Sequence, residues 1–251
     1  MSNVYETPKS GLVNESGGED QFGSIEKGLS GDYEFSISAV LNEAWEKVSG
    51  TKLTFFLAAL IYIGVFIGLS IVFQIIIGVI ISTLSPGVAV VIGLIQQIIF
   101  SLIILPIAAG LFMLGIRRAA DASIQPGSIL GYFSKMLPLF FTTLLMSIMI
   151  FIGFLLLILP GIYLTIAYYM AVPLVVEKGL GPWEALETSR KVITKRWFTM
   201  LFFGIVMSII VFISAIPLFI GLIWTIPLMA IGYGIIYRNM FGIRKETLTE
   251  A

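Results

Sequence analysis

The residues that could carry chemistry stand at the edges of long apolar stretches, and two versatile residue types are missing. The chain contains no cysteine and no histidine, which excludes thiolate nucleophiles, cysteine metal sites and the usual proton shuttle near neutral pH. The charged candidates that remain are Arg117, Arg118, Asp121, Glu177, Glu184 and Glu187. Glu184 and Glu187 could share a metal ion, but carboxylates at i, i+3 on a wet helix far more often form only a solvated face. With no nucleotide or metal motif present, we expect no enzymatic activity and no cofactor.

Glutamines are the polar groups that stand deepest inside the apolar stretches. Gln74, Gln96 and Gln97 are flanked by isoleucine, leucine and phenylalanine. An unpaired amide in lipid costs several kcal/mol, so these side chains should face protein or water. They either line a polar cavity for a substrate or form hydrogen bonds between helices, which typically contribute about 0.6 to 2 kcal/mol. We favour the second role.

A basic cluster precedes the last apolar stretch. Arg190, Lys191, Lys195 and Arg196 lie within seven positions of the chain. Such residues can contact anionic lipid headgroups, at about 1 kcal/mol per charge near the surface. The alternative, which we favour, is that they only anchor and orient the neighbouring helices.

The composition identifies the class of protein. Of the 251 residues 58% are hydrophobic and 12% are charged, whereas soluble domains have about 45–50% apolar and about 25% charged residues. The sequence therefore predicts an integral membrane protein. The 15 basic residues balance the 15 acidic ones, so net charge indicates no acidic partner, and we expect no nucleic-acid binding.

Three tracts, at residues 53–116, 136–176 and 197–237, contain no charged residue. A helix of about 20 residues crosses a hydrocarbon core of roughly 30 Å, and a continuous 41-residue helix would measure about 60 Å. We therefore predict an all-α polytopic fold with six transmembrane helices arranged as three hairpins. Proline and glycine end helices and permit reversals, which places the hairpin turns at Pro86-Gly87, Pro160-Gly161 and Pro217. The fourth span, which contains Pro173, is short or enters at an angle.

The basic residues set the expected orientation. With six spans, every lysine and arginine, Lys52 among them, falls on one face. The positive-inside rule makes that face cytoplasmic, so both termini are predicted to be cytoplasmic. Tyr163 and Trp224 are then expected in an aromatic belt on the outer face.

Outside the tracts the chain divides into tails and amphipathic helices. Residues 1–34 are acidic and polar, which predicts a disordered cytoplasmic tail. The membrane domain is predicted at residues 35–245, beginning with an amphipathic helix at 36–50, where apolar residues recur at helical spacing. A second such helix is expected at 181–197 and a shorter one at 128–135. Residues 246–251 are predicted to form a short cytoplasmic tail.

Three segments together carry a resemblance to a known group of proteins. They are "PIAAGLFMLGIRRA" (106–119), "LLLILPGIYLTIAYYMAVPLVVEKGLGPWEALETSRKV" (155–192) and "IYRNMFGI" (236–243). The chain resembles the bacterial YciC-like integral membrane families, which are similar to the membrane part of some glycerophosphodiester phosphodiesterases. The resemblance implies a six-helix protein of the bacterial inner membrane. No phosphodiesterase catalytic domain accompanies it, so no enzymatic activity is implied.

These patterns lead to two functional hypotheses. The first is a non-enzymatic inner-membrane protein that organises lipids or partner proteins at the cytoplasmic face. The alternative is a permease or carrier component for an apolar or lipid-like molecule. The expected partners are membrane lipids, together with a membrane protein partner or a second copy of the chain, since Gly64-x-x-x-Gly68 permits close helix approach.

Overall fold

The computed structural model describes residues 22–81 and 85–249, and this part of the chain is helical without any strand, as predicted. The helices are α1 (Ile25–Ser30), α2 (Ile37–Val48), α3 (Lys52–Ile81), α4 (Pro86–Ala119), the 3₁₀ helix η1 (Pro126–Lys135), α5 (Met136–Leu156), α6 (Ile158–Ala167), α7 (Ala171–Pro173), the π-helix η2 (Leu174–Lys178), α8 (Pro182–Lys195), α9 (Trp197–Ala215), α10 (Leu222–Phe241) and α11 (Lys245–Thr249).

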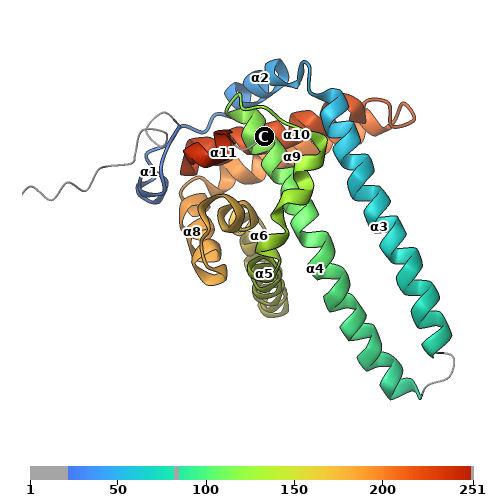
Figure 1. Cartoon of the computed structure of the whole chain (residues 1–251). Helices are drawn as coiled ribbons and strands as arrows, with labels where there is room; N and C mark the ends of the chain where they lie inside the picture. Colours follow the sequence, from blue (N-terminus) through green and yellow to red (C-terminus); the bar gives the residue numbers. More distant parts are fainter. Residues whose placement is uncertain (1–21, 82–84, 250–251) are drawn as a thin grey trace, which may run out of the picture.

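Helices α3 and α4 lie side by side and extend beyond the other helices (Figure 1). Helix α3 has 30 residues and α4 has 34, so each is at least about 45 Å long. Apolar side chains on their outer halves are exposed, for example Ile75 at 63%, Val90 at 64% and Leu94 at 62%. A water-soluble protein rarely exposes so continuous an apolar surface, whereas lipid tails accept it.

Five segments in the described part are long and apolar enough to cross a membrane: Lys52–Gly78, Gly87–Ala119, Pro126–Leu156, Ile158–Lys178 and Trp197–Ala215. They are typical of a multi-pass integral membrane protein. The sixth predicted span corresponds to α10, which is not among these segments. Other helices, rather than lipid, cover most of α10, and its buried residues include Gly232, Gly234 and Tyr237.

Helix α10 is the centre of the packing. It contacts α4 along much of its length and also contacts α2, α9, α1 and α3. Two glycines let α4 and α10 cross with their backbones touching. A Cβ atom added to Gly234 would lie 2.3 Å from the backbone oxygen of Gly115, and one added to Gly115 would lie 2.1 Å from that of Ala230. The crossing therefore depends on the absence of side chains at these positions.

The two ends of the predicted domain differ from the expected tails. Residues 22–34 were predicted to belong to a disordered tail, but they include α1, which packs on α8 and α10. Gly28 lets α1 approach the backbone of Met240, and the Tyr33 hydroxyl donates to the Val192 oxygen at 2.9 Å. Burial of these groups offsets the entropy that the segment loses when it becomes ordered. The polar composition gave no sign of this burial. Residues 1–21 lie outside the described residues. At the other end, α11 begins at Lys245.

Helix α2 lies where the amphipathic helix 36–50 was predicted. Its buried side chains are Val40, Ala44 and Val48, and its main neighbour is α10. The apolar face of α2 is therefore covered by protein, whereas the prediction placed the amphipathic helices on the membrane surface. Trp45, which belongs to the apolar series of the prediction, is 59% exposed.

The three predicted hairpin turns lie at different positions relative to the helices of the structure. Pro86 and Gly87 open α4, where proline is favoured because the first helical position needs no amide donor. Pro160 and Gly161 lie inside the first turn of α6, and the chain reverses at the extended residue Leu157 instead. Proline is tolerated in a first turn, and Gly161 packs closely against Phe154 of α5. Pro217 lies between α9 and α10, in the predicted turn.

The fourth apolar segment, Ile158–Lys178, is long enough to span but is not one regular helix. It consists of α6, α7 and η2, with a break at residues 168–170. The short or angled fourth span that the sequence predicts stays a prediction, because the segment has 21 residues and its break gives no angle to a membrane. The break has a structural consequence, because it carries Tyr168 and Tyr169 into the protein interior.

Two contacts contradict the predicted distribution of residues between the membrane faces. The Tyr163 hydroxyl lies 2.7 Å from that of Thr194, and its backbone oxygen accepts a bond from Trp197. The Lys52 ammonium lies 4.8 Å from the Trp224 ring centroid. Residues in contact cannot lie on opposite sides of a core roughly 30 Å thick. It is therefore wrong to place Tyr163 and Trp224 on the outer face. They lie on the same side as Lys52 and the segment around Thr194.

Cysteine labelling should show which residues lie on which face of the membrane. The chain is suited to this experiment because it has no cysteine of its own. Ser85→Cys, in the exposed turn before α4, should react with a membrane-impermeant maleimide from the face opposite to Ser123→Cys. Leu218→Cys, between α9 and α10 and 84% exposed, should not react from the Ser85 face. If Leu218→Cys reacted from the same face as Ser85→Cys, the turn at residue 218 would lie on the outer face. The arrangement inferred from the contacts of Tyr163 and Trp224 would then be wrong.

Candidate functional site

A stacked pair of tyrosines lies where the broken fourth segment meets α10. The ring centroids of Tyr169 and Tyr233 are 4.4 Å apart, with 29° between the ring planes. Phe112 meets Tyr169 edge-on at 5.9 Å, and Phe203 meets Tyr233 edge-on at 5.2 Å. Such aromatic pairs contribute about 0.5–1.5 kcal/mol each beyond area burial. The four rings therefore fix one another where α4, α9, α10 and the break after α6 meet.

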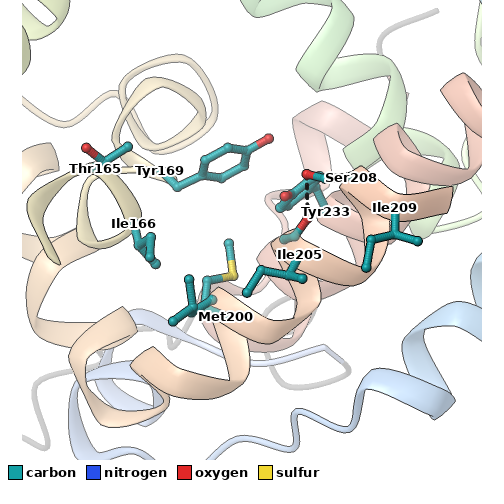
Figure 2. A pocket seen from close by; sticks show the side chains of 10 residues that line it. Thr165, Ile166, Tyr169, Met200, Ile205, Ser208, Ile209 and Tyr233 are labelled. Carbon is teal, nitrogen blue, oxygen red and sulfur yellow. Dashed lines mark hydrogen bonds between the residues drawn. The ribbon is translucent and has the colours of Figure 1, made fainter. Parts of the chain in front are cut away.

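The first pocket lies on one side of this stack, between α6, α9 and α10, and has a volume of about 350 Å³ (Figure 2). Its lining is largely apolar and includes Ile166, Met200 and Ile205. The lining hydroxyls of Thr165 and Ser208 donate to backbone oxygens of their own helices, each at 2.8 Å. The pocket therefore offers an occupant mainly hydrocarbon surface and two tyrosine rings.

Gly204 of α9 keeps part of this pocket open. A Cβ atom added there would lie 3.7 Å from the Tyr233 hydroxyl, which is ordinary van der Waals contact. A methyl group fits at this position, whereas a larger side chain would extend into the pocket. Gly204 is thus the position from which the first pocket can be filled.

A second pocket, of about 300 Å³, lies between α3, α4 and α10. It is lined by Phe55, Ala59, Tyr62, Leu111 and Met229, and Tyr169 and Tyr233 border this pocket too. The tyrosine pair is therefore a wall shared by two apolar pockets. The sequence reasoning missed both residues, because aromatic residues in apolar tracts are usually only packing.

The polar cavity predicted at the three glutamines does not coincide with the tyrosine pockets. Gln74 and Gln97 are exposed on α3 and α4, and Gln96 is half-buried. The three glutamines line neither of the tyrosine pockets. The structure brings Gln96 and Gln97 together only as neighbours on one helix.

The basic residues of the predicted headgroup cluster divide into two kinds. Arg190 donates twice to Glu187, with both distances 2.9 Å. This bond lowers the pKa of Glu187 and raises that of Arg190. Lys191 is exposed and lies 3.9 Å from the same carboxylate. Lys195 and Arg196 are exposed at the end of α8, so these two have the most freedom to contact lipid.

Glu177, expected at the rim of the membrane, is buried in a network of donors. Its carboxylate accepts from the Tyr237 hydroxyl at 2.9 Å, from the Arg244 amide at 2.6 Å and from the Thr247 hydroxyl at 3.3 Å. The buried Lys178 ammonium lies 3.4 Å away. Both charged side chains are at most 2% exposed. This network ties η2 to α10 and to the segment that leads into α11, which makes it a structural junction.

Two other charged candidates, Arg117 and Glu184, lie in different surroundings. Arg117 is buried, and its Nε and Nη2 have no hydrogen-bond partner among the described residues. Glu184 is exposed on α8. Within residues 22–81 and 85–249, no three acidic side chains lie close enough together to hold a metal ion.

Comparisons with known proteins identify no relative of this chain. No family model, no curated protein and no solved structure matches the chain. The YciC-like resemblance therefore stays an expectation from the sequence.

Proposed function

We propose that this chain is a non-enzymatic integral membrane protein that binds and organises lipid-like molecules in a bacterial inner membrane. The observation that carries the proposal is the pair of apolar pockets that meet at Tyr169 and Tyr233. Their volumes lie at the lower end of the roughly 300–1,000 Å³ range of ligand pockets. An apolar lining within a membrane favours a hydrocarbon chain over a water-soluble molecule.

The proposal keeps the charged side of the protein, with both termini, in the cytoplasm. Ion pairs support one common charged side, because Arg238 at the end of α10 binds Glu43 of α2, and Lys47 of α2 binds Asp121 after α4. We propose that the α3–α4 hairpin crosses the membrane completely. The α5–α6 and α9–α10 hairpins enter from the charged side, since Tyr163 and Trp224 contact residues of that side.

A carrier function is the second candidate, and the shared wall favours it. A rotation of Tyr169 and Tyr233 would join the pocket beside α3 and α4 to the pocket beside α6 and α9. An apolar molecule could then pass from one side of α10 to the other. Either function has membrane lipids as the immediate partner, and a protein partner or a second copy of the chain remains a prediction.

Lipid crosslinking tests the proposal. The full chain in bilayer nanodiscs would be exposed to a phospholipid with a diazirine in its acyl chain, and labelled peptides would be identified by mass spectrometry. We expect labelling around residues 165–169 and 200–209, reduced several-fold by Gly204→Leu, which fills the first pocket. Gly64→Leu, in open space on α3, is the matched control and should leave the pattern unchanged. Labelling that is insensitive to Gly204→Leu would remove the support for a pocket-bound lipid.

A further inference from the structure

A third pocket, polar in character, lies at the charged ends of α3 and α4. Its volume is about 360 Å³. One wall is the turn between α2 and α3, and the other is the end of α4 with the loop that follows. The lining includes Ser49, Gly50, Thr51, Thr54, Arg118 and Ser123. A cation and several hydroxyl groups therefore face one cavity, which brings together Arg118 and Asp121 of the charged candidates and is separate from the tyrosine pockets.

Arg118 is held in place before any ligand arrives. Its Nε donates to the backbone oxygen of Lys47 at 3.0 Å, and its Nη2 donates to that of Ser49 at 3.4 Å. The third nitrogen, Nη1, has no hydrogen bond to any described residue. Guanidinium groups favour the oxygens of phosphates and carboxylates. Because Arg118 is already oriented, an anion that binds its free nitrogen need not order the side chain.

The backbone contributes to the same cavity. Helix α3 begins at Lys52, directly after the lining residue Thr51. The first amides of a helix have no acceptor within it, and the helix dipole favours negative charge there. Gly50 has a φ of +77°, and a Cβ atom added to it would meet nothing within 4 Å. The turn before α3 thus leaves room for a ligand beside Arg118.

The local charges leave a positive excess. Asp121 also lines the pocket, but its carboxylate lies 2.5 Å from the Lys47 ammonium. Glu43 is bound by Arg238 at 2.8 Å. With Asp121 and Glu43 neutralised, Arg118 is the lining cation without an ion-pair partner among the described residues, and the buried Arg117 beside it adds a second positive charge to this end of α4. Lys52 lies at the neighbouring end of α3, over the Trp224 ring.

We propose that this pocket binds a phosphate group, and that the phosphate belongs to a lipid headgroup. The same two helices line the apolar pocket further along. Thr54 and Tyr62 are eight residues apart on α3, which is about 12 Å, and Arg118 and Leu111 are separated by about 10 Å on α4. A phospholipid with its phosphate at Arg118 would reach the second pocket with an acyl chain. The choice of a lipid rests on the proposed function, whereas the phosphate site does not.

Calorimetric titration of the full chain in nonionic micelles tests the site with two probes, dihexanoyl phosphatidic acid and inorganic phosphate. Arg118→Lys should weaken binding at least tenfold, because the Nη1 donor that the two backbone hydrogen bonds orient is lost. Thr54→Val should weaken it several-fold, and Asp121→Asn should strengthen it several-fold. Lys27→Gln, which removes an exposed cation of α1, should have no effect. The changes at Thr54 and Asp121 keep the test valid if Arg118→Lys loosens the α2–α3 turn.

The two probes separate the sources of the phosphate. Binding of phosphatidic acid alone, with this pattern of variants, supports the lipid headgroup. Binding of both probes with this pattern supports the phosphate site without requiring the apolar pocket, and it would persist in Gly204→Leu even if the proposed lipid function failed. Binding of neither probe overturns the proposal. So does binding that ignores Thr54→Val and Asp121→Asn but falls in Lys27→Gln.

Discussion

Replacing Glu177 by alanine is expected to lower the free energy of unfolding by about 3–5 kcal/mol, the usual cost of removing one partner of a buried ion pair. The carboxylate is the common acceptor of the Tyr237 hydroxyl, the Arg244 amide and the Thr247 hydroxyl, and it lies 3.4 Å from the Lys178 ammonium. Alanine leaves these donors without their acceptor in a site that excludes water. Unfolding by SDS in mixed micelles, followed by tryptophan fluorescence, measures the loss.

Glu184→Ala is the matched control for this experiment. Glu184 is exposed on α8, so its removal should change the free energy of unfolding by less than about 0.5 kcal/mol. Glu177→Gln should lie between the two, because the amide keeps one oxygen acceptor but loses the charge that faces Lys178. Equal stability of Glu177→Ala and Glu184→Ala would show that the buried network does not hold the C-terminal segment.

The second large effect is expected at the crossing of α4 and α10. Gly234→Ala would place a Cβ atom 2.3 Å from the Gly115 backbone oxygen, and Gly115→Ala would place one 2.1 Å from the Ala230 oxygen. Backbone atoms of two packed helices cannot move aside separately, so the helices must separate. We expect each change to lower the free energy of unfolding by about 3 kcal/mol, at the upper end of overpacking effects. The same SDS titration measures it.

Gly64→Ala provides the comparison, because a Cβ atom on Gly64 meets nothing within 4 Å. Alanine should be neutral or slightly stabilising there, since it favours the helix by up to about 1 kcal/mol. If Gly234→Ala were as stable as Gly64→Ala, the two backbones would not be in contact, and the central position of α10 would need revision.

Periodicity and charge predicted the parts of the fold that depend on local sequence. The apolar series from Ile37 to Val48 has the helical spacing that α2 adopts. The absence of charges in the three tracts predicted α3, α4, α5 and α9, because length and hydropathy alone determine whether a helix can cross a membrane. Pro217 marked a turn correctly, since proline cannot continue the preceding helix.

The parts that depend on contacts between distant residues could not be predicted. Residues 22–34 look like a polar tail, but the packing of Gly28 and Tyr33 on distant backbone atoms orders them, together with the Ser24 and Gly31 caps of α1. Glu177 looked like a rim residue because its donors come from α10 and from residues 244–247. Tyr169 and Tyr233 are 64 positions apart, and nothing in their neighbours distinguishes them from packing residues.

The prediction for the third tract was wrong at Trp224. It assigned Trp224 to the outer face because it assumed that each half of a 41-residue tract crosses completely. Helix α10 instead lies across α4 at the glycine pair and brings Trp224 to Lys52. The absence of charge from residues 197–237 made α10 resemble a span, although α10 is not among the segments that are long and apolar enough to cross a membrane.

The central claim is that lipid-like molecules occupy the pockets at the tyrosine pair. Native mass spectrometry of the full chain, isolated in nanodiscs and released from mild detergent, tests it most directly. The account predicts that the native chain retains phospholipid, and that a variant with both pockets filled, Gly204→Leu with Ala59→Phe, loses it while Gly64→Leu retains it. Equal retention by the filled variant and the native chain, or a native chain without lipid, would contradict the account.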